Sequence, residues 1–362
     1  MPTGQTGSGD VRYVRVAILK DISRMRLKID GFFELTDVAS GKVFYRGKNL
    51  NTTVLAYKDH VSFGSVKSKA RKIFIRTYDP DIIIINGRIF RGDLQLLCNP
   101  DASFDIINKI ELEDYVKGIL YHEVSHYWPQ EALKSQAVIS RTYAVYEAQR
   151  NKGKDYDLKS DIYSQVYGGK TSERYRTNIA VDETRGQVVV YRGRPIPTYY
   201  HATCAGRTED ASAIWNINIP PLKGVECNFC KDSPHFNWHY VLPLEELESE
   251  LSDAGYAIQG IQEIQVLSRN SSGRVSQLKL VADKRSVVIS AKDLRNALGP
   301  NMIRSTKFNV EIRGSDVVFE GSGWGHGVGL CQWGAYFMAK QGKKYDEILK
   351  YYYPGSEIST LN

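Results

Sequence analysis

Residues 111–144 read ELEDYVKGILYHEVSHYWPQEALKSQAVISRTYA, and this stretch predicts two consecutive helices. One stripe of helical spacing in its first half contains Leu112, Val116, Ile119 and Glu123. Pro129 has the fixed φ that suits a first helical residue, so we expect the second helix to start there and to run to about Arg150. Glu123 therefore occupies a position where the pattern otherwise places apolar side chains.

Strand patterns precede these helices, and mixed patterns follow them. Asn86-Gly87 between two apolar runs predicts a hairpin, and Gly299-Pro300 ends a helix predicted from Ala291. Strands in one block and helices in the next are typical of an α+β fold. The predicted parts are an unstructured or artificial start at 1–10, a β-rich N-terminal region at 11–105, a central helical core with the candidate sites at 106–240, a small α/β insertion at 241–320, and a glycine-rich strand with C-terminal helices closing the core at 321–362.

Composition excludes several classes of protein. The 362 residues are 42% hydrophobic and 25% charged, which is ordinary globular usage and excludes disorder and collagen. The longest apolar run, Ile82 to Ile85, is far shorter than the ~20 residues of a membrane helix. The net charge of +7 is spread along the chain without a basic block or base-reading motif. We therefore expect no nucleic-acid partner.

Glu123 is a candidate general acid. A carboxyl group that faces a core is costly unless it is paired, and withdrawal from water favours its protonated form. Such a group suits proton donation in catalysis. The alternative is a solvated glutamate at a frayed helix end.

The same glutamate lies in His122-Glu123-Val124-Ser125-His126, which matches the H-E-x-x-H pattern of zinc metalloproteases. On one continuous helix both histidines could bind zinc, with Glu147 as a third ligand. However, Pro129 disfavours helical geometry at the preceding residue. An inward Glu123 also leaves adjacent His122 about 100° round the helix. Both observations weigh against a zinc metalloprotease, which stays a distant alternative function.

Two short ligand pairs predict a metal site. With two residues between the members of each pair, the predicted ligands of one structural zinc ion are His201, Cys204, Cys227 and Cys230. His235 is an alternative fourth ligand, and a disulfide or free buried thiols are the alternatives to metal. We expect Cys98 and Cys331 to be packing residues.

Glycines alternate strictly from Gly321 to Gly329 in GSGWGHGVG. This spacing does not satisfy the G-x-G-x-x-G pattern of a nucleotide-binding loop. It fits a segment that a ligand or another backbone approaches closely, with His326 projecting from it. Tight packing around a satisfied histidine is the alternative.

The chain resembles the stage II sporulation protein D family. The resemblance rests on Leu112 to Glu123 and Pro129 to Ala144, on Asp161 with Tyr163 to Gly169, and on HATCAGRT from His201. The closing block GWGHGVGLCQWGA from Gly323, followed by Ile348-Leu349 and Tyr352 to Gly355, is the most specific part. Matching segments run in family order from about Ile84 to Glu357.

The resemblance implies a peptidoglycan lytic transglycosylase of the cell envelope, outside the cytoplasm, that acts on glycan strands lacking stem peptides. It implies that Glu123 is the catalytic acid. It also implies cooperation with a wall amidase, and membrane association only through a segment absent from this chain. Because the family includes amidase enhancers, a glycan-binding scaffold that does not cut glycan is the alternative.

Other polar residues in the matched motifs are candidate glycan contacts. We expect Arg141 and Arg207 to pair with the lactyl carboxylate, although Arg141 could instead form a structural salt bridge. The candidates for acetamido groups and ring faces are Gln136, Gln165, Gln332, Tyr143, Tyr167 and Trp324, with His326 beside them.

Overall fold

The computed structural model describes residues 11–78, 82–161, 165–283 and 285–361. It has the α+β fold and the β-rich N-terminal region that the sequence predicts. The chain divides into unit 1, which is Met1–Pro197 with Ile358–Asn362, and unit 2, which is Thr198–Glu357. The predicted start at 1–10 and the motif residues Tyr163 and Ser164 lie outside the described residues.

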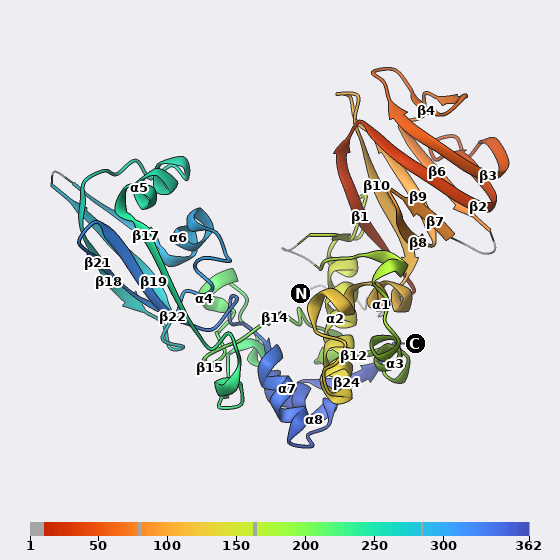
Figure 1. Cartoon of the computed structure of the whole chain (residues 1–362). Helices are drawn as coiled ribbons and strands as arrows, with labels where there is room; N and C mark the ends of the chain where they lie inside the picture. The colour runs from red at the N-terminus through yellow and green to blue at the C-terminus, as the bar shows by residue number, and fades with distance from the viewer. Residues whose placement is uncertain (1–10, 79–81, 162–164, 284, 362) are drawn as a thin grey trace, which may run out of the picture. The chain divides into compact units, whose positions relative to one another are not determined.

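Unit 1 contains an eleven-stranded sheet whose main path runs β11-β1-β10-β9-β6-β2-β3-β4-β5, with a β7–β8 hairpin attached to β2 (Figure 1). Neighbouring strands pair antiparallel, except that β11 pairs parallel with β1. The strands are β1 (Tyr13–Ile22), β2 (Arg24–Asp37), β3 (Val43–Ala56), β4 (Val61–Phe63), β5 (Val66–Ser68), β6 (Lys72–Thr77), β7 (Ile82–Ile85), β8 (Arg88–Arg91), β9 (Asp93–Cys98), β10 (Phe104–Glu111) and β11 (Leu158–Lys159).

The predicted hairpin at Asn86-Gly87 is confirmed. Ile85 of β7 pairs with Arg88 of β8, so Asn86 and Gly87 between them form the turn. Their φ values of 49° and 85° are both positive, as a two-residue turn of type I′ requires.

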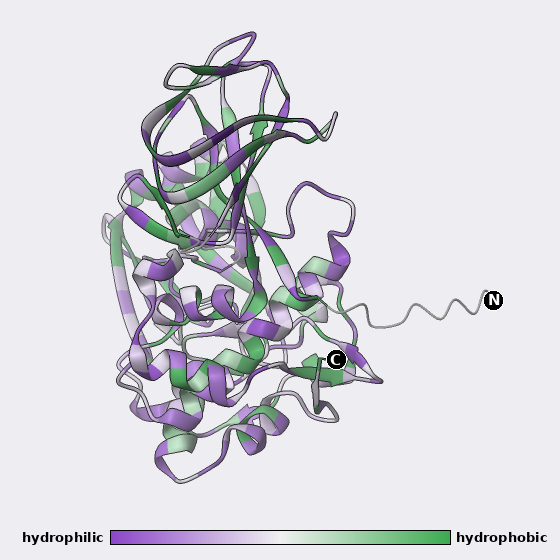
Figure 2. Cartoon of the chain, turned by 90° about the vertical axis from the view of Figure 1, so that its right-hand side faces the viewer, coloured by the Kyte–Doolittle hydropathy of each residue, from purple (hydrophilic) through white to green (hydrophobic). Residues whose placement is uncertain are grey.

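Alternating burial along the strands builds the core of unit 1. In β2, Met25, Leu27 and Ile29 are buried, while the alternate residues Arg24, Arg26 and Asp30 are exposed. The same alternation appears as green and purple stretches along the ribbons in Figure 2. Because successive strand side chains point to opposite faces, this pattern fixes which face packs.

Three helices follow the sheet in sequence: α1 (Leu112–Glu123), α2 (Gln130–Arg150) and α3 (Tyr175–Glu183), with a 3₁₀ turn, η1 (Gly169–Ser172), before α3. Figure 1 shows α1 and α2 at one end of the sheet. Pro129 directly precedes α2, so the second helix begins one residue later than predicted. A small sheet joins β12 (Gln187–Tyr191) to β13 (Arg194–Pro195) and to β24 (Glu357–Thr360) from the end of the chain.

A buried ion pair joins α1 to α2. Arg141 is fully buried, and its Nε and Nη2 donate to the two carboxylate oxygens of Glu113 at 2.8 and 2.7 Å. The same guanidinium donates to the carbonyl oxygens of Gln187 and Val181. One side chain thus connects α1, α2, α3 and β12.

Unit 2 contains a module with its own hydrophobic core, which includes Trp238, Leu251, Leu278 and Phe319. Its two three-stranded sheets have the orders β17-β22-β21 and β18-β19-β20. The elements of the module are β17 (Asn237–Pro243), α5 (Leu244–Asp253), β18 (Ile261–Arg269), β19 (Val275–Ala282), β20 (Ser286–Ser290), α6 (Ala291–Leu298), β21 (Phe308–Arg313) and β22 (Asp316–Ser322).

The remainder of unit 2 consists of short elements. These are β14 (Tyr200–His201), β15 (Gly206–Arg207), α4 (Ser212–Trp215), η2 (Pro220–Leu222), β16 (Glu226–Cys227), η3 (Cys230–Asp232), β23 (Leu330–Cys331), α7 (Gln332–Lys340) and α8 (Tyr345–Tyr352). Among them, β14 pairs with β23 and β15 pairs with β16, which are distant in the sequence. Within the described residues, no helix combines the length and apolar character needed to cross a membrane.

The glycine run of unit 2 is packed closely by other backbone, as both sequence interpretations expect, and His326 Nδ1 accepts from the Val328 N–H, as the alternative interpretation expects. Gly323, Gly325, Gly327 and Gly329 all have positive φ. A Cβ on Gly323 would lie 2.6 Å from the carbonyl oxygen of Thr203, and one on Gly329 would collide with that of Tyr199. Side chains are therefore excluded at these positions.

Replacing Arg141 by Met should lower the free energy of unfolding by about 3–5 kcal/mol, because it leaves the Glu113 carboxylate buried without its partner. Urea denaturation of the purified protein would measure this loss. The matched control is Arg185→Met, which breaks the exposed Arg185–Glu111 pair and should change stability by less than about 1 kcal/mol. Equal stability of the two variants would contradict the structural role of Arg141.

Candidate functional site

Glu123 is the last residue of α1, and this position excludes the metalloprotease geometry. The helix ends there because Val124 is extended, with φ −144° and ψ 152°. His122 and His126 are therefore not one turn apart on a continuous helix. The His122 Nε2 atom lies 2.6 Å from Ser172 Oγ, and the His126 ring packs against Tyr127. Glu147 is engaged elsewhere, with Arg150 and Asn151.

Predicted residues of unit 1 gather around Tyr115. Tyr115 is buried, and its hydroxyl donates to Gln165 Oε1 at 3.0 Å. Burial raises the pKa of Tyr115 well above its ordinary value, and the negative charge of Glu123 acts in the same direction. The phenol therefore stays neutral beside the half-buried Glu123.

Sequence reasoning gave Tyr115 no role, although a signal was present. Tyr115 precedes Ile119 by four residues and Glu123 by eight, so the three share the helical stripe. A tyrosine on that stripe places an apolar ring and a hydrogen-bonding hydroxyl on the same helix face as the candidate carboxyl group.

Four predicted glycan contacts are buried inside unit 1: Gln136, Arg141, Gln165 and Tyr167. Arg141 forms the structural salt bridge to Glu113 that was its alternative interpretation. The Gln136 amide donates to Ser140 Oγ, and the Tyr167 hydroxyl donates to Asn108 Oδ1 at 3.0 Å. The structure thus places these side chains in the interior of unit 1, where their hydrogen bonds support the fold. Tyr143 is half-buried against the same core.

The other predicted residues lie in unit 2. Arg207 is 38% exposed and 3.8 Å from Glu226. Trp324 is half-buried, and the Arg304 guanidinium lies 4.9 Å from its ring centroid. Burial lowers the pKa of His326 to about 3, and the charge of Arg274 acts in the same direction. Gln332, the first residue of α7, is buried.

Four buried cysteines of unit 2 form one cluster, and they are Cys204, Cys227, Cys230 and Cys331. Their sulfurs all lie within 4.8 Å of one another. Within the described part of the chain, this is the only group of at least three His, Cys, Asp or Glu side chains that could hold a metal ion. The HExxH residues form no such group there.

The fourth member of the cluster differs from the expectation. The structure brings in Cys331, which was expected to be a packing residue, and not His201. The His201 Nδ1 atom lies 3.1 Å from the carbonyl oxygen of Val328. The alternative fourth ligand, His235, packs edge-on against Trp324. Cys331 joins because parallel pairing of β14 with β23 places it opposite His201, in a segment far along the chain.

Backbone donors and neighbouring thiols surround the sulfurs. The backbone N–H groups of Cys204 and Gly334 each donate to Cys331 Sγ at 3.3 Å. Hydrogen bonds among the thiols lower the pKa of Cys227 and Cys230, whereas burial and the neighbouring thiols raise the pKa of Cys331. Such donors around the sulfurs are a feature of metal–thiolate sites.

Two cations lie close to the cluster. The buried Arg274 donates to the carbonyl oxygen of Cys204 at 3.0 Å, and Lys307 donates to that of Ala205 at 2.7 Å. Burial lowers the pKa of both groups, and the cysteines of the cluster act in the opposite direction. The positive charges of Arg274 and Lys307 would offset the net negative charge of a metal ion bound by four thiolates.

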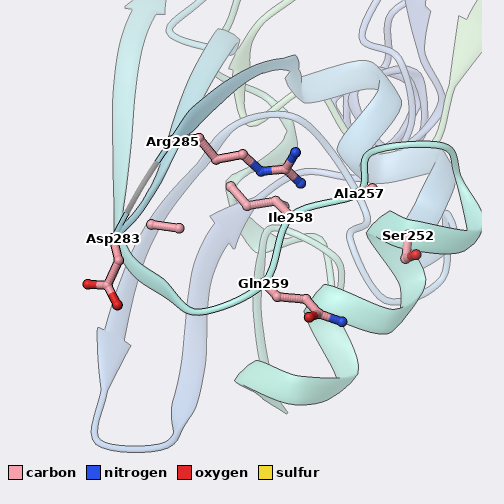
Figure 3. Close-up of a pocket in the computed structure, with 7 residues that line it drawn as sticks. Ser252, Ala257, Ile258, Gln259, Asp283 and Arg285 are labelled. Atoms are coloured by element: carbon pink, nitrogen blue, oxygen red, sulfur yellow. The ribbon is translucent and has the colours of Figure 1, made fainter.

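A surface hollow of about 530 Å³ lies in the module of unit 2 (Figure 3). It is lined by Ser252, Ala257, Ile258, Gln259, Ala282, Asp283 and Arg285. None of the residues predicted for the site lines this hollow.

Comparison with known proteins gives consistent matches. A family model described as stage II sporulation protein matches residues 101–191, and a model for a domain of unknown function matches residues 223–329. An uncharacterized protein of Brachyspira hyodysenteriae is 37% identical over 285 residues, which cover 78% of this chain and 75% of that protein.

Two Bacillus subtilis proteins are also similar. Stage II sporulation protein D is 31% identical over 268 residues, which cover 70% of this chain and 76% of that protein. The amidase enhancer is 26% identical over 293 residues, which cover 68% of this chain and 40% of the enhancer.

If the four sulfurs bind one metal ion, Cys331→Ser should destabilise the protein as much as Cys227→Ser. Each change removes one of four ligands, so both variants should melt at lower temperature and retain less metal by elemental analysis. Cys98→Ser is the control, because Cys98 lies outside the cluster. A Cys331→Ser protein with wild-type metal content would exclude Cys331 as a ligand.

Proposed function

Since the chain belongs to the stage II sporulation protein D family, we propose that it is a peptidoglycan lytic transglycosylase with Glu123 as its catalytic residue. The relatives support a cell-wall related function. The proposed substrate is a glycan strand from which stem peptides have been removed. The proposed location is the cell envelope, outside the cytoplasm.

The position of Glu123 carries this proposal. Its side chain is half-buried at the C-terminal end of α1 and lies close enough to Tyr115 to affect the ionisation of that phenol. The dipole of a helix disfavours negative charge at this end, and partial burial acts in the same direction. A carboxyl group held in this way is suited to give a proton and then take one back.

One carboxyl group is sufficient for the reaction. Glu123 protonates the glycosidic oxygen, so that the bond between MurNAc C1 and GlcNAc O4 breaks and the GlcNAc hydroxyl leaves. The MurNAc C6 hydroxyl then attacks C1, and the Glu123 carboxylate takes its proton. The products are a 1,6-anhydro-MurNAc end and a free GlcNAc O4 hydroxyl, and no water is consumed. A hydrolysing glycosidase would use a second carboxyl group.

The buried residues around Glu123 support its position in this proposal. Gln165 holds the Tyr115 hydroxyl, and the Arg141–Glu113 pair holds α1 against α2. Tyr143, Arg207, Trp324, His326 and Gln332 stay predictions as glycan contacts.

We also propose that the four cysteines bind one structural zinc ion. Sulfurs about 2.3 Å from a tetrahedral zinc lie about 3.8 Å apart. The Cys204–Cys230 and Cys227–Cys230 sulfur separations are 3.5 and 4.0 Å, on either side of that value. A closed set of four protein ligands stabilises a fold and leaves no position for substrate. The zinc would thus connect β16, β23 and η3 of unit 2.

A glycan-binding enhancer of a wall amidase is the second candidate function. It is favoured by the similarity to the amidase enhancer. In either case a cooperating amidase is a proposed partner: it would supply a transglycosylase with strands that lack stem peptides, and it would be the enzyme that an enhancer stimulates.

Glu123→Gln should reduce cleavage of peptide-free glycan at least ~10²-fold, the usual scale for general acid–base catalysis. The amide keeps the shape of the side chain but cannot supply the proton. Mass spectrometry of the products would detect 1,6-anhydro-MurNAc ends. The control is Glu131→Gln at the start of α2, where the carboxylate pairs with Lys134, and it should retain activity. Activity of Glu123→Gln within a few-fold of wild type would overturn the assignment.

The two candidate functions predict different results with a purified wall amidase. A transglycosylase should release anhydro ends from peptide-free strands when no amidase is present. An enhancer should release none, but should raise the rate of amidase action on intact peptidoglycan, and Glu123→Gln should leave that stimulation unchanged. Stimulation without anhydro products would select the enhancer.

A further inference from the structure

Three arginines lie around the C-terminal end of α1 in unit 1: Arg88 at the start of β8, and Arg174 and Arg176 near the start of α3. Their effect is visible at His122, the neighbour of Glu123. Partial burial lowers the pKa of His122, and the charges of Arg88 and Arg174 lower it further. Positive charge is thus concentrated around His122, which directly precedes the proposed catalytic residue in the sequence.

In the described part of the chain, Arg174 and Arg176 donate to backbone carbonyl oxygens and form no ion pair with a carboxylate. Arg174 donates from Nη1 to the oxygens of Thr171 and Glu173 at 3.1 and 2.8 Å. Arg176 donates to the oxygens of His126 and Trp128 at 3.0 and 2.9 Å. The nearby Glu173 carboxylate is bound by Arg91 instead. The charge of Arg174 therefore remains available to an anion.

Aromatic rings extend from Arg174. Its guanidinium lies 4.1 Å from the centroid of the Tyr121 ring. Tyr121 in turn packs against His126 at 5.7 Å, and His126 against Tyr127 at 4.0 Å, measured between ring centroids. Tyr127 is 79% exposed. Exposed rings of this kind offer flat faces for sugars.

The His122 side chain connects this surface to α1. Its 2.6 Å contact with Ser172 Oγ joins the end of α1 to η1, and Arg174 follows η1 by two residues. The arginine is therefore held beside the end of α1 by contacts within unit 1.

We propose that Arg174, assisted by Arg88, binds the lactyl carboxylate of a MurNAc residue, while Tyr121, His126 and Tyr127 receive the faces of adjoining sugars. This inference rests on the proposed function and adds to it a basis for substrate choice. Removal of a stem peptide converts a neutral lactyl amide into a carboxylate. An arginine without a carboxylate partner binds that anion strongly and the amide weakly. The subsite thus selects strands that an amidase has already processed.

Binding measurements in the Glu123→Gln protein test the subsite without cleavage of the probe. The probes are peptide-free glycan strands, the same strands with their carboxylates converted to methylamides, and chitin oligosaccharides, which carry no lactyl group. We expect the carboxylate strands to bind on the order of ten-fold more tightly than either neutral probe at low salt. When Arg174→Gln or Arg88→Gln is introduced into the Glu123→Gln protein, most of this preference for carboxylate strands should disappear.

The matched control is Arg192→Gln, because Arg192 is an exposed arginine 5.2 Å from the ring centroid of Tyr191 on another part of unit 1. It should keep the full preference. Melting temperatures would verify folding, and Arg88→Gln keeps the test valid if Arg174→Gln is unstable. Equal binding of carboxylate and neutral strands would overturn the subsite. An unchanged preference for carboxylate strands in both Arg174→Gln and Arg88→Gln would do the same. A preference that depends on Arg174 in a protein that cuts no glycan would support the subsite and reject the transglycosylase function.

Discussion

The buried guanidinium of Arg141 is the contact on which the arrangement around Glu123 depends. It is fully buried, and its donors reach the Glu113 carboxylate and the carbonyl oxygens of Val181 and Gln187. A buried charge is tolerated only when it is paired and hydrogen-bonded, so these elements have little freedom to separate. Because Glu113 and Glu123 lie on the same helix, the pair also sets where the proposed catalytic carboxyl group stands.

In unit 2, a cluster of cysteine side chains connects elements that are too short to hold together by backbone pairing alone. Its short strands β14, β15, β16 and β23 contribute only two residues each, which is too few for a stable sheet. Four cysteines from these strands and the adjoining loops meet in one cluster, with backbone N–H donors and two cations around it. A metal ion at this point would add strong bonds where the hydrogen-bonded ladders are short. The positive-φ glycines from Gly323 to Gly329 serve the same close packing, since a side chain there would collide with neighbouring atoms.

The surface near Glu123 combines features that suit an acidic, sugar-rich polymer. Arg174 forms no ion pair with a carboxylate among the described residues, and rings continue from it to the exposed Tyr127. Positive charge attracts an anionic strand over distances near the Debye length, and flat rings then orient the sugars. The surface that would bind the strand and the carboxyl group that would cleave it would thus both belong to unit 1.

The sequence by itself determined the local features of this protein. Helical spacing located α1 and α2 and placed Glu123 on the inward stripe, Asn86-Gly87 specified a hairpin, and three of the four clustered cysteines were identified from spacing. These features depend on residues within about one turn or one short motif, so pattern is sufficient to find them. The closing glycine block and the motifs around Glu123 carried the family resemblance.

Only the tertiary structure decided which distant residues meet. Cys331 lies 127 positions from Cys204, and no spacing rule reaches that far. Arg141 and Tyr167 belong to the motifs that carry the family resemblance, and only the tertiary structure shows that both are buried, Arg141 against Glu113 and Tyr167 against Asn108. The end of α1 at Glu123, which separates the two histidines of HExxH, likewise depends on the extended backbone at Val124. Partners of this kind follow from the packing of whole elements, and the sequence pattern of any one element does not contain them.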